Sequence, residues 1–239
     1  SYNFARVAID LALARGGDQA VVKQGKTITY YGGKREQTSK NTRVKARVKA
    51  EALREFMMAK DHIIVMGHRI ADVDSFGAAV GIYRAAKVME KKAYIVLNDI
   101  TSSVRPFYQA FCDSVSYPDD MFIKSSEVSG VMTENTMVVV VDTNKPELTE
   151  CPELLKMAKT IVVFDHHRQG NDVIENTILS YIEPYASSAC EMVAEVLQYI
   201  ADNIKITSIE ANSMYAGIMI DTNNFMNRTG VRTFEAAAF

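Results

Sequence analysis

The sequence contains few cysteines and no long apolar run, and each absence excludes a class of protein. Its 239 residues include three cysteines, Cys112, Cys151 and Cys190, which lie far apart and form no C-x-x-C pair. This spacing argues against a disulfide framework and a structural zinc site, and it favours a reducing cytoplasm. No apolar run approaches the ~18 residues of a membrane span, and no signal-peptide pattern is present.

The chain also has little net charge, but the charge is unevenly distributed. The formal net charge is -2, yet residues 23–60 carry 11 Lys and Arg against 3 Glu, which leaves 16 basic and 26 acidic residues elsewhere. No aromatic residues interleave the basic segment SKNTRVKARVKAEALREF as nucleobase stacking would require. We therefore expect a solvated linker and helix face there, and we expect the acidic remainder to bind no long nucleic acid.

The composition is that of a soluble globular protein, with 48% hydrophobic and 23% charged residues. Ser1 is not methionine, and the C-terminal segment RTFEAAAF indicates a helix that is just beginning. Both ends look cut, so we expect a piece of a longer protein.

Three segments are predicted along the chain. In residues 1–33, NFARVAIDLALARGG has helical spacing with a stop at Gly16 and Gly17, and QAVVKQGKTITYYGG indicates a hairpin that turns at Gly25. Residues 34–60 form a basic linker and, from about Thr42, a connecting helix. Residues 61–239 form the main domain.

The main domain alternates apolar runs with amphipathic segments. Strands are expected at Ile63–Met66, Tyr94–Leu97, Met137–Val141 and Ile161–Phe164, and helices at residues 75–90, 104–112, 152–159, 188–201 and 208–220. Short runs rich in Val and Ile are typical of strands that are buried on both faces of a parallel sheet. The fold class is therefore α/β, with a mostly parallel central sheet flanked by helices and a small N-terminal α+β remnant.

Acidic and histidine side chains follow three of these four strands directly. The first strand leads to His68, Asp72 and Asp74, the third to Asp142, and the fourth to Asp165, His166 and His167, while Asp221 follows a later apolar segment. A lone Asp in such a place is usually a turn or cap residue. Together, at the carboxyl ends of parallel strands where ligands bind, these side chains indicate a metal site.

The types of ligand indicate which metal is bound. Carboxylates dominate, imidazole is the minority and thiolate is absent, which favours Mg²⁺ or Mn²⁺, and the imidazoles favour Mn²⁺. Six candidate ligands are too many for one ion but suit a pair. Two metal ions about 3.5–4 Å apart stabilise the attacking and leaving oxygens of a phosphoryl displacement.

The segments GHRIADVDSFG, VVDTN, FDHH and IDTNNF resemble, in order, the four signature motifs of the DHH phosphoesterase superfamily. RGGDQAVVK, YYGGK, PYASSACEMV and NRTGVRTFEAA are further similar to GdpP-type cyclic-di-AMP phosphodiesterases. In that family a degenerate GGDEF-like domain precedes the DHH domain, and membrane helices lie further upstream. Residues 1–33 then resemble the tail of the GGDEF-like domain, and residues 61–239 resemble the DHH domain.

The resemblance also implies roles for individual residues. Six metal ligands are implied: His68 and Asp72 on one manganese, Asp74, His166 and Asp221 on the other, and Asp142 bridging both. Asp165 would orient a ligand, and His167 would face the substrate phosphate, so that Asp142, Asp165 and His167 form the catalytic set. Arg228 and Arg232 would donate to phosphate, with a surface position as the alternative for each. Ser188 is expected to cap the following helix.

The implied activity is hydrolysis of cyclic di-AMP to linear pApA by a water that two Mn²⁺ ions activate, with Mg²⁺ or another divalent cation as an alternative. The resemblance implies a cytoplasmic position on a membrane-anchored parent, no membrane contact by these residues, and a possible homodimer. The family's glycine-rich C-terminal lobe is absent, so this chain is expected to bind metals yet hydrolyse substrate poorly. Two alternatives remain: another DHH activity (oligonucleotide hydrolase, single-strand exonuclease or pyrophosphatase), or a non-catalytic nucleotide sensor.

Overall fold

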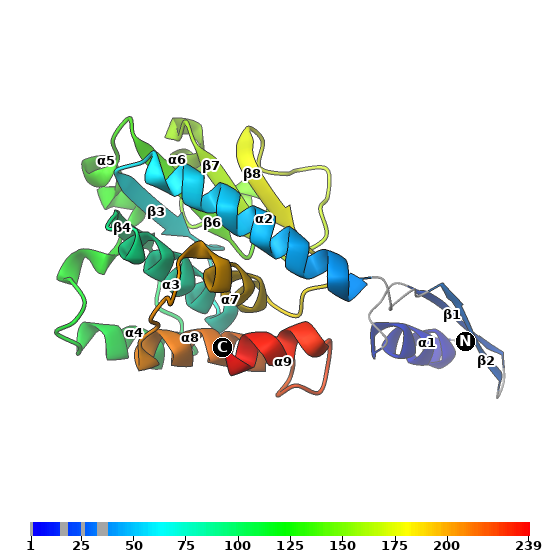
Figure 1. The fold of residues 1–239 in the computed structure, drawn as a ribbon. Coiled ribbons are helices and arrows are strands. Elements are labelled where there is room, and N and C mark those ends of the chain that lie inside the picture. Colours follow the sequence, from blue (N-terminus) through cyan, green and yellow to red (C-terminus); the bar gives the residue numbers. More distant parts are fainter. Residues whose placement is uncertain (1, 15–18, 25–26, 33–37) are drawn as a thin grey trace.

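The computed structural model describes residues 2–14, 19–24, 27–32 and 38–239. At the N-terminus, helix α1 (Tyr2–Ala14) packs on an antiparallel hairpin of β1 (Gln19–Gln24) and β2 (Thr27–Gly32), as predicted. The predicted helix stop at Gly16 and Gly17 and the predicted turn at Gly25 lie outside the described residues. Helix α2 (Thr38–Met58) begins four residues before the predicted start and leads into the main domain (Figure 1).

A six-stranded sheet forms the centre of the main domain. Its strands are β3 (His62–Met66), β4 (Lys92–Val96), β5 (Phe122–Ile123), β6 (Thr136–Val141), β7 (Ile161–Asp165) and β8 (Thr177–Ile182). Their order is β5-β4-β3-β6-β7-β8, and every neighbouring pair is parallel. The predicted α/β class with a mostly parallel sheet is confirmed, and the four predicted strands are β3, β4, β6 and β7.

The two edge strands, β5 and β8, were not predicted from the sequence. β8, with the sequence TILSYI, alternates between exposed and buried residues because only one of its faces is fully covered. β5 contains only two residues. Both lack the continuous apolar run by which the central strands were recognised, since an edge strand is buried less than a central one.

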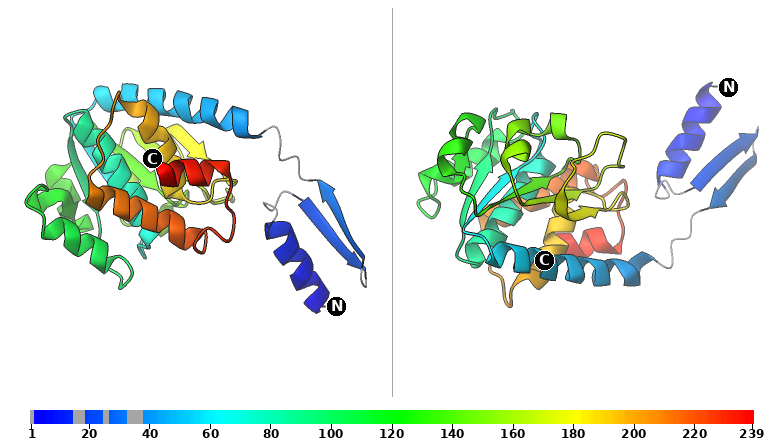
Figure 2. Two further views of the ribbon diagram at one scale, coloured as in Figure 1. Left: turned by 60° about the horizontal axis from the view of Figure 1, so that its bottom comes forward. Right: turned by 90° about the horizontal axis from the view of Figure 1, so that it is seen from above.

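Successive residues of the central strands point to opposite faces of the sheet and pack in two hydrophobic cores. Ile63 and Val65 of β3 face the core that includes α2, α3 (Val73–Val88) and α7 (Ala189–Ile200), whereas Ile64 and Met66 face α5 (Val128–Val131) and α6 (Pro152–Met157). Helix α8 (Ser208–Asp221) packs on α3 and α7, α9 (Val231–Ala238) packs on α7 and α8 (Figures 1 and 2), and α4 (Arg105–Cys112) contacts α8. Short 3₁₀ turns occupy Asp119–Met121, Ser125–Glu127 and Pro146–Leu148.

Helices α3, α7 and α8 approach one another closely because glycines face the contact. A side-chain carbon at Gly217 of α8 would lie 2.5 Å from Sγ of Cys190 and 2.9 Å from Cα of Asp74. A side-chain carbon at Gly77 of α3 would lie 2.6 Å from the carbonyl oxygen of Ser213. All three distances are shorter than a side-chain carbon can reach without a clash. Glycine at both positions therefore sets how near α8 comes to the start of α3.

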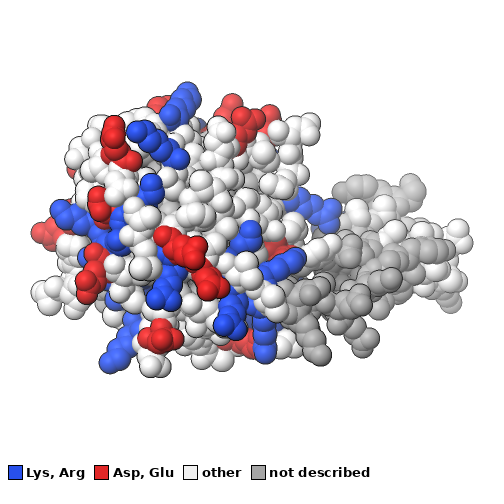
Figure 3. Space-filling model, turned by 45° about the horizontal axis from the view of Figure 1, so that its top comes forward, with Lys and Arg blue, Asp and Glu red and all other residues white. Residues whose placement is uncertain are grey.

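The basic residues of α2 are partly used within the chain. Three of them pair with groups of the main domain: Arg43 with the Glu235 carboxylate, Lys45 with Glu183 at 3.6 Å, and Lys49 with the carbonyl oxygen of Ser180 at 2.9 Å. Basic and acidic side chains are interspersed over the face in Figure 3. Among the residues that the structure describes, no helix is both long enough and apolar enough to cross a bilayer.

We expect Gly217→Ala to lower the free energy of unfolding by about 1–3 kcal/mol, because the added methyl group overpacks the contact with α7 and α3. Urea unfolding followed by circular dichroism measures this change. Gly130→Ala is the matched control, since a side-chain carbon there has nothing within 4 Å. Equal stability of the two variants would contradict the close-packing argument.

Candidate metal centre

The candidate site lies where the strand order of the sheet reverses. From the central pair β3 and β6, the chain builds outward through β4 and β5 on one side and through β7 and β8 on the other. The loops after β3 and β6 therefore diverge at their carboxyl ends, which is the usual position of a ligand site in an open α/β sheet. The β3 loop carries His68, and Asp142 directly follows β6.

His68 and Asp72 occupy the short connection from β3 to α3. The backbone of His68 forms an isolated bridge with Thr149. Asp72 is the N-cap of α3, where its carboxylate accepts a 2.9 Å hydrogen bond from the amide of Ser75. Nε2 of His68 lies 3.3 Å from Oδ2 of Asp72 and 3.3 Å from Oδ2 of Asp142. These three side chains converge on one point.

A second group converges on His166, which follows β7. Its Nε2 lies near one oxygen from each of three carboxylates: Asp142 Oδ1 at 3.2 Å, Asp221 Oδ2 at 3.4 Å and Asp74 Oδ2 at 3.8 Å. Asp74 belongs to the first turn of α3, and Asp221 is the last residue of α8. The close contact of α3 with α8 therefore brings these two carboxylates together.

Asp74 is also bound to the start of α7. Its two carboxylate oxygens accept hydrogen bonds from the amides of Ala189 at 2.6 Å and Cys190 at 2.9 Å. The first amides of a helix carry partial positive charge, which favours a carboxylate at this position. Ser188 caps the same helix by accepting from the amide of Glu191 at 3.0 Å, and the cap predicted for it is confirmed.

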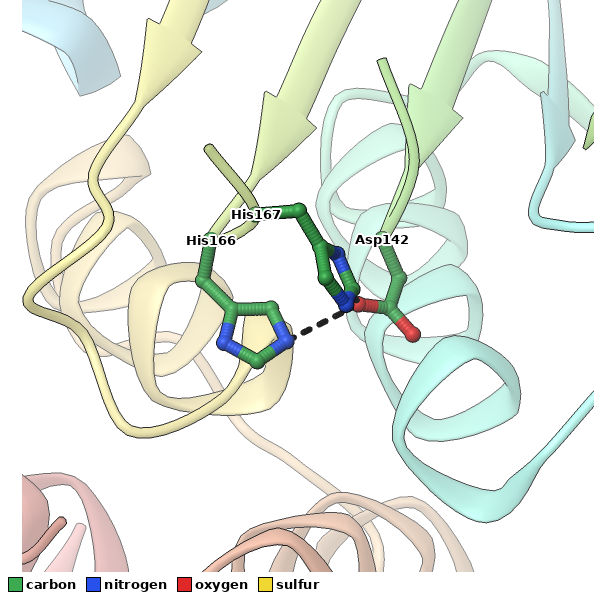
Figure 4. A group of neighbouring side chains, drawn as sticks. All are labelled: Asp142, His166 and His167. Carbon is green, nitrogen blue, oxygen red and sulfur yellow. Dashed lines mark ion pairs between the residues drawn. The ribbon is translucent and has the colours of Figure 1, made fainter. Parts of the chain in front are cut away.

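Asp142 stands between the two groups. It is only 3% exposed, and its φ of 60° is a conformation that residues other than glycine rarely adopt. One carboxylate oxygen faces His68 and the other faces His166. Figure 4 shows the latter pair, with His167 beside it. Backbone strain of this kind persists where surrounding structure holds it, and such positions cluster at functional sites.

His167 is held by a buried carboxylate. Oδ1 of Asp165 lies 2.7 Å from Nδ1 of His167 and accepts a 3.0 Å hydrogen bond from the amide of the same residue. Asp165 is fully buried, and its other oxygen accepts a hydrogen bond from the side-chain amide of Asn144. The His167 side chain itself is 58% exposed. Asp165 thus fixes a ring that remains open to solvent.

Asn144 is a site residue that was not predicted from the sequence. It ends the segment VDTN, directly beyond Asp142, and it is 3% exposed. The sequence did contain a signal for it. A side-chain amide that stands with an acid directly after a predicted buried strand is a candidate to form a hydrogen bond with that acid or with a neighbouring acid.

The acids and histidines perturb one another strongly. Burial lowers the pKa of His68, but bonding to Asp142 and Asp72 outweighs it and raises the pKa to about 10. The pKa of His166 is raised to about 9, since the nearby carboxylates, Asp142 first, outweigh burial in the same way. Burial raises the pKa of Asp221 to about 6. The imidazoles therefore hold protons at neutral pH unless another cation takes their place.

Burial and the charges of Asp142 and Asp221 raise the pKa of Asp74. Asp142 differs from its neighbours, because the attraction of the nearby His166 and His68 imidazoles outweighs burial and lowers its pKa. One oxygen of Asp142 has no hydrogen-bond partner within the described part of the chain. A buried anion with a vacant acceptor beside two imidazole nitrogens is the arrangement that a bound cation would complete.

The donor set fits divalent metal ions. Three overlapping groups have all their ligand atoms within 4.8 Å of one another: His68, Asp72 and Asp142; Asp74, His166 and Asp221; Asp142, His166 and His167. Within the described residues these groups contain every metal ligand that the sequence predicted. Asp165 belongs to none of these groups, and its orienting role stays a prediction. Oxygen ligands with a minority of imidazole suit Mn²⁺ or Mg²⁺.

The two predicted phosphate-binding arginines lie in different environments. Arg228 is exposed and has a φ of 55°. Arg232 donates from Nε and Nη2 to both carboxylate oxygens of Glu195, at 2.6 and 2.7 Å, and its side chain is 13% exposed. A phosphate at Arg232 would have to compete with this bidentate partner.

Comparison with known proteins identifies one matching family. Residues 62–218 match the family described as "DHH family, N-terminal domain". The chain is 41% identical to the cyclic-di-AMP phosphodiesterase GdpP of Geobacillus thermodenitrificans, over 98% of this chain and 36% of that protein. It is 42% identical to GdpP of Bacillus subtilis, over 99% of this chain and 36% of that protein. The chain thus spans about a third of the length of these relatives.

A solved structure shares the fold. An exopolyphosphatase-related protein from Bacteroides fragilis superimposes with a TM-score of 0.66, covering 80% of this chain and 55% of that one. The two sequences are 16% identical, so this likeness concerns the fold alone.

We expect metal binding to release protons. Because the pKa values of His68 and His166 are raised to about 10 and 9, both imidazoles are protonated at pH 7 and must lose that proton to bind an ion. Affinity for Mn²⁺ should therefore rise with pH up to these values, with about one proton released per ion at pH 7. Near pH 5.5 more should be released, because Asp221, with its pKa raised to about 6, is then also protonated.

Isothermal titration calorimetry in buffers that differ in ionisation enthalpy measures this proton release directly. An observed enthalpy that is the same in every buffer at pH 7 would contradict the proposed competition between protons and metal.

Proposed function

The chain belongs to the DHH family, and from this premise we propose that it is the catalytic domain of a metal-dependent phosphodiesterase that opens cyclic di-AMP to linear pApA. The substrate rests on the 41–42% identity to the GdpP relatives over nearly the whole of this chain. The reaction type rests on the site. Because the chain covers 36% of those relatives, further parts of a longer protein would complete the substrate pocket.

A single observation carries the proposal of metal-assisted hydrolysis. The two carboxylate oxygens of Asp142 face opposite ways, one 3.3 Å from the Nε2 atom of His68 and one 3.2 Å from that of His166. A carboxylate placed in this way would bridge two cations. Each imidazole then belongs to a separate ligand group, so the geometry supports two ions rather than one.

The residues that would hold each ion follow from these groups. His68, Asp72 and Asp142 would hold one Mn²⁺, and Asp74, His166, Asp221 and the second oxygen of Asp142 would hold the other. Bound divalent cations would activate a water and offset negative charge on the phosphoryl oxygens. The start of α7 fixes the orientation of Asp74, because its amides donate to both carboxylate oxygens; Oδ2, which accepts from Ala189, is also the oxygen 3.8 Å from Nε2 of His166 and would share its second lone pair with an ion.

His167 is the residue that we assign to the substrate. Asp165 accepts from Nδ1 of its ring, which leaves Nε2 directed to the substrate, where the doubly protonated ring would donate to a phosphoryl oxygen. Asp165 is fully buried and accepts a hydrogen bond from the side-chain amide of Asn144. The His167 ring therefore keeps its orientation while its other edge stays open to solvent. Asp165 and Asn144 would act through His167 rather than on the substrate.

Arg228 is the better candidate for a phosphate donor. It is exposed, and it lies in the loop between Asp221 and α9. Arg232 is already paired with Glu195 and lies 3.7 Å from a carboxylate oxygen of Glu191. We propose that Arg232 mainly joins α9 to α7, and that Arg228 reaches the substrate.

The remaining parts of the proposal concern the setting of the domain. We propose that it acts on the cytoplasmic side of a membrane-anchored parent, takes a cyclic dinucleotide rather than long nucleic acid, and works as a homodimer. The near balance of charge, with basic α2 residues paired inside the chain, supports a small substrate over a nucleic-acid track.

We expect Asp142→Asn to reduce cyclic di-AMP hydrolysis by on the order of 100-fold or more, because loss of a bridging ligand should cost at least as much as loss of a group that supports a ligand. The assay uses the longest expressible form of the protein with Mn²⁺ and separates pApA by chromatography. Asp61→Asn is the matched control, since that exposed aspartate precedes β3 at the opposite end of the sheet. Cleavage of linear dinucleotides or pyrophosphate, with cyclic di-AMP intact, would overturn the substrate assignment.

The two arginines should respond differently to substitution. We expect Arg228→Gln to raise KM by roughly 10- to 100-fold with unchanged stability, since one charged donor to phosphate contributes about 1.5–3 kcal/mol. Arg232→Gln should instead lower the free energy of unfolding by about 3–5 kcal/mol, because it leaves the buried Glu195 without its partner. Urea unfolding and steady-state kinetics on both variants separate the roles, and the reverse pattern would contradict the assignment.

A further inference from the structure

A buried carboxylate outside the ligand groups, Glu150, lines a small cavity together with His68. Glu150 is 5% exposed, and its Oε2 accepts hydrogen bonds from the backbone amide of Asn98 at 3.2 Å and from its side-chain amide at 2.7 Å. Its other oxygen, Oε1, is buried and has no hydrogen-bond partner within the described residues. A buried carboxylate oxygen without a donor is costly, so a donor is expected to reach it.

The segment that carries Glu150 also fixes the backbone around His68. The amide of Glu150 donates to the carbonyl oxygen of Gly67 at 3.0 Å, and the amide of Arg69 donates to Leu148 at 2.6 Å. Between these two bonds, His68 forms its bridge with Thr149. The backbone of Glu150 is therefore held at a fixed position relative to the backbone of His68.

The two side chains line the same small cavity. Ser75 lines it as well, together with mostly apolar residues of α3, β4 and the adjoining loops, and its volume of about 10 Å³ is about what one water molecule requires. The three polar side chains around it are enough to bind one water, which needs two to four polar partners. An apolar residue in place of Glu150 would leave a dry gap there.

We propose that Glu150 is a positioning residue for His68, with one water in this cavity joining Oε1 of Glu150 to Nδ1 of the imidazole. The inference rests on the proposed function, because it assigns His68 to an ion. Nε2 of His68 faces Asp72 and Asp142, so Nδ1 is the atom that remains to donate. A histidine that binds metal through one nitrogen usually donates from the other to a carboxylate, carbonyl or water, which fixes the tautomer and the ring orientation.

The inference predicts an effect on one ion only. His68 belongs to one ligand group, and the group of Asp74, His166 and Asp221 does not contain it. We expect Glu150→Gln to weaken Mn²⁺ binding about tenfold at the His68 ion and to leave the second ion within about twofold, in line with losses measured for groups that support metal ligands. Calorimetric titration of this chain resolves the two events, and thermal unfolding of the metal-free chain checks the fold.

A spectroscopic readout distinguishes positioning from a structural role. In ¹H–¹⁵N spectra of histidine-labelled chain loaded with diamagnetic Mg²⁺, Glu150→Gln should move the Nδ1 resonance of His68 and leave that of His166 in place. Glu183→Gln is the matched control, because Glu183 is also a buried carboxylate (6% exposed) but does not line the cavity. It should change neither the affinities nor the His68 resonance.

Three results would overturn the inference: unchanged affinity and an unmoved resonance in Glu150→Gln, equal weakening of both ions, or the same changes in Glu183→Gln. A wild-type chain that binds no Mn²⁺ would overturn it together with the assigned ligands. Failure of the substrate assignment is distinguishable, because cyclic di-AMP would then stay intact while Mn²⁺ binding and the effect of Glu150→Gln persisted.

Discussion

Repulsion among carboxylates at the carboxyl edge of the sheet is the constraint on which this structure depends. Asp74 and Asp142 are almost fully buried, and Asp221 lies beside them. Burial of like charges raises the free energy unless positive charge compensates it. Within the chain, two imidazoles and the amides of α7 compensate part of it. Divalent cations would compensate the rest, and so the same feature that strains the fold equips it to bind metal.

The helices around the site are fixed by contacts that lie away from it. Arg84 of α3 forms a bidentate ion pair with the fully buried Glu210 of α8, with bonds of 2.6 to 2.9 Å. At the other end of the contact between α3 and α8, the absence of a side chain at Gly217 lets α8 approach Asp74. Breaking a buried ion pair costs about 3–5 kcal/mol. The position of Asp221 relative to Asp74 therefore depends on packing rather than on any direct bond between them.

Polar residues without a place in the ligand groups lie next to two of the histidines. Asp165, to which Asn144 donates, holds His167, and Glu150, to which Asn98 donates, lines the same small cavity as His68. Asp165 ends β7, and the other three lie in loops at the same edge of the sheet. This arrangement follows from the parallel topology, because the carboxyl end of every strand contributes a loop to one surface.

By itself, the sequence determined the α/β class, the four central strands and the identity of the metal-ligand candidates. These follow from local patterns: continuous apolar runs identify buried strands, and the motif residues stand directly at their ends. It did not reveal β8, the role of Asn144 or the pairing of Arg232 with Glu195. The bond of Asp74 to the amide of Ala189, 115 positions away, was also hidden. Only the tertiary structure decided these, because they depend on how helices pack across the sheet, and no spacing along the chain encodes that distance.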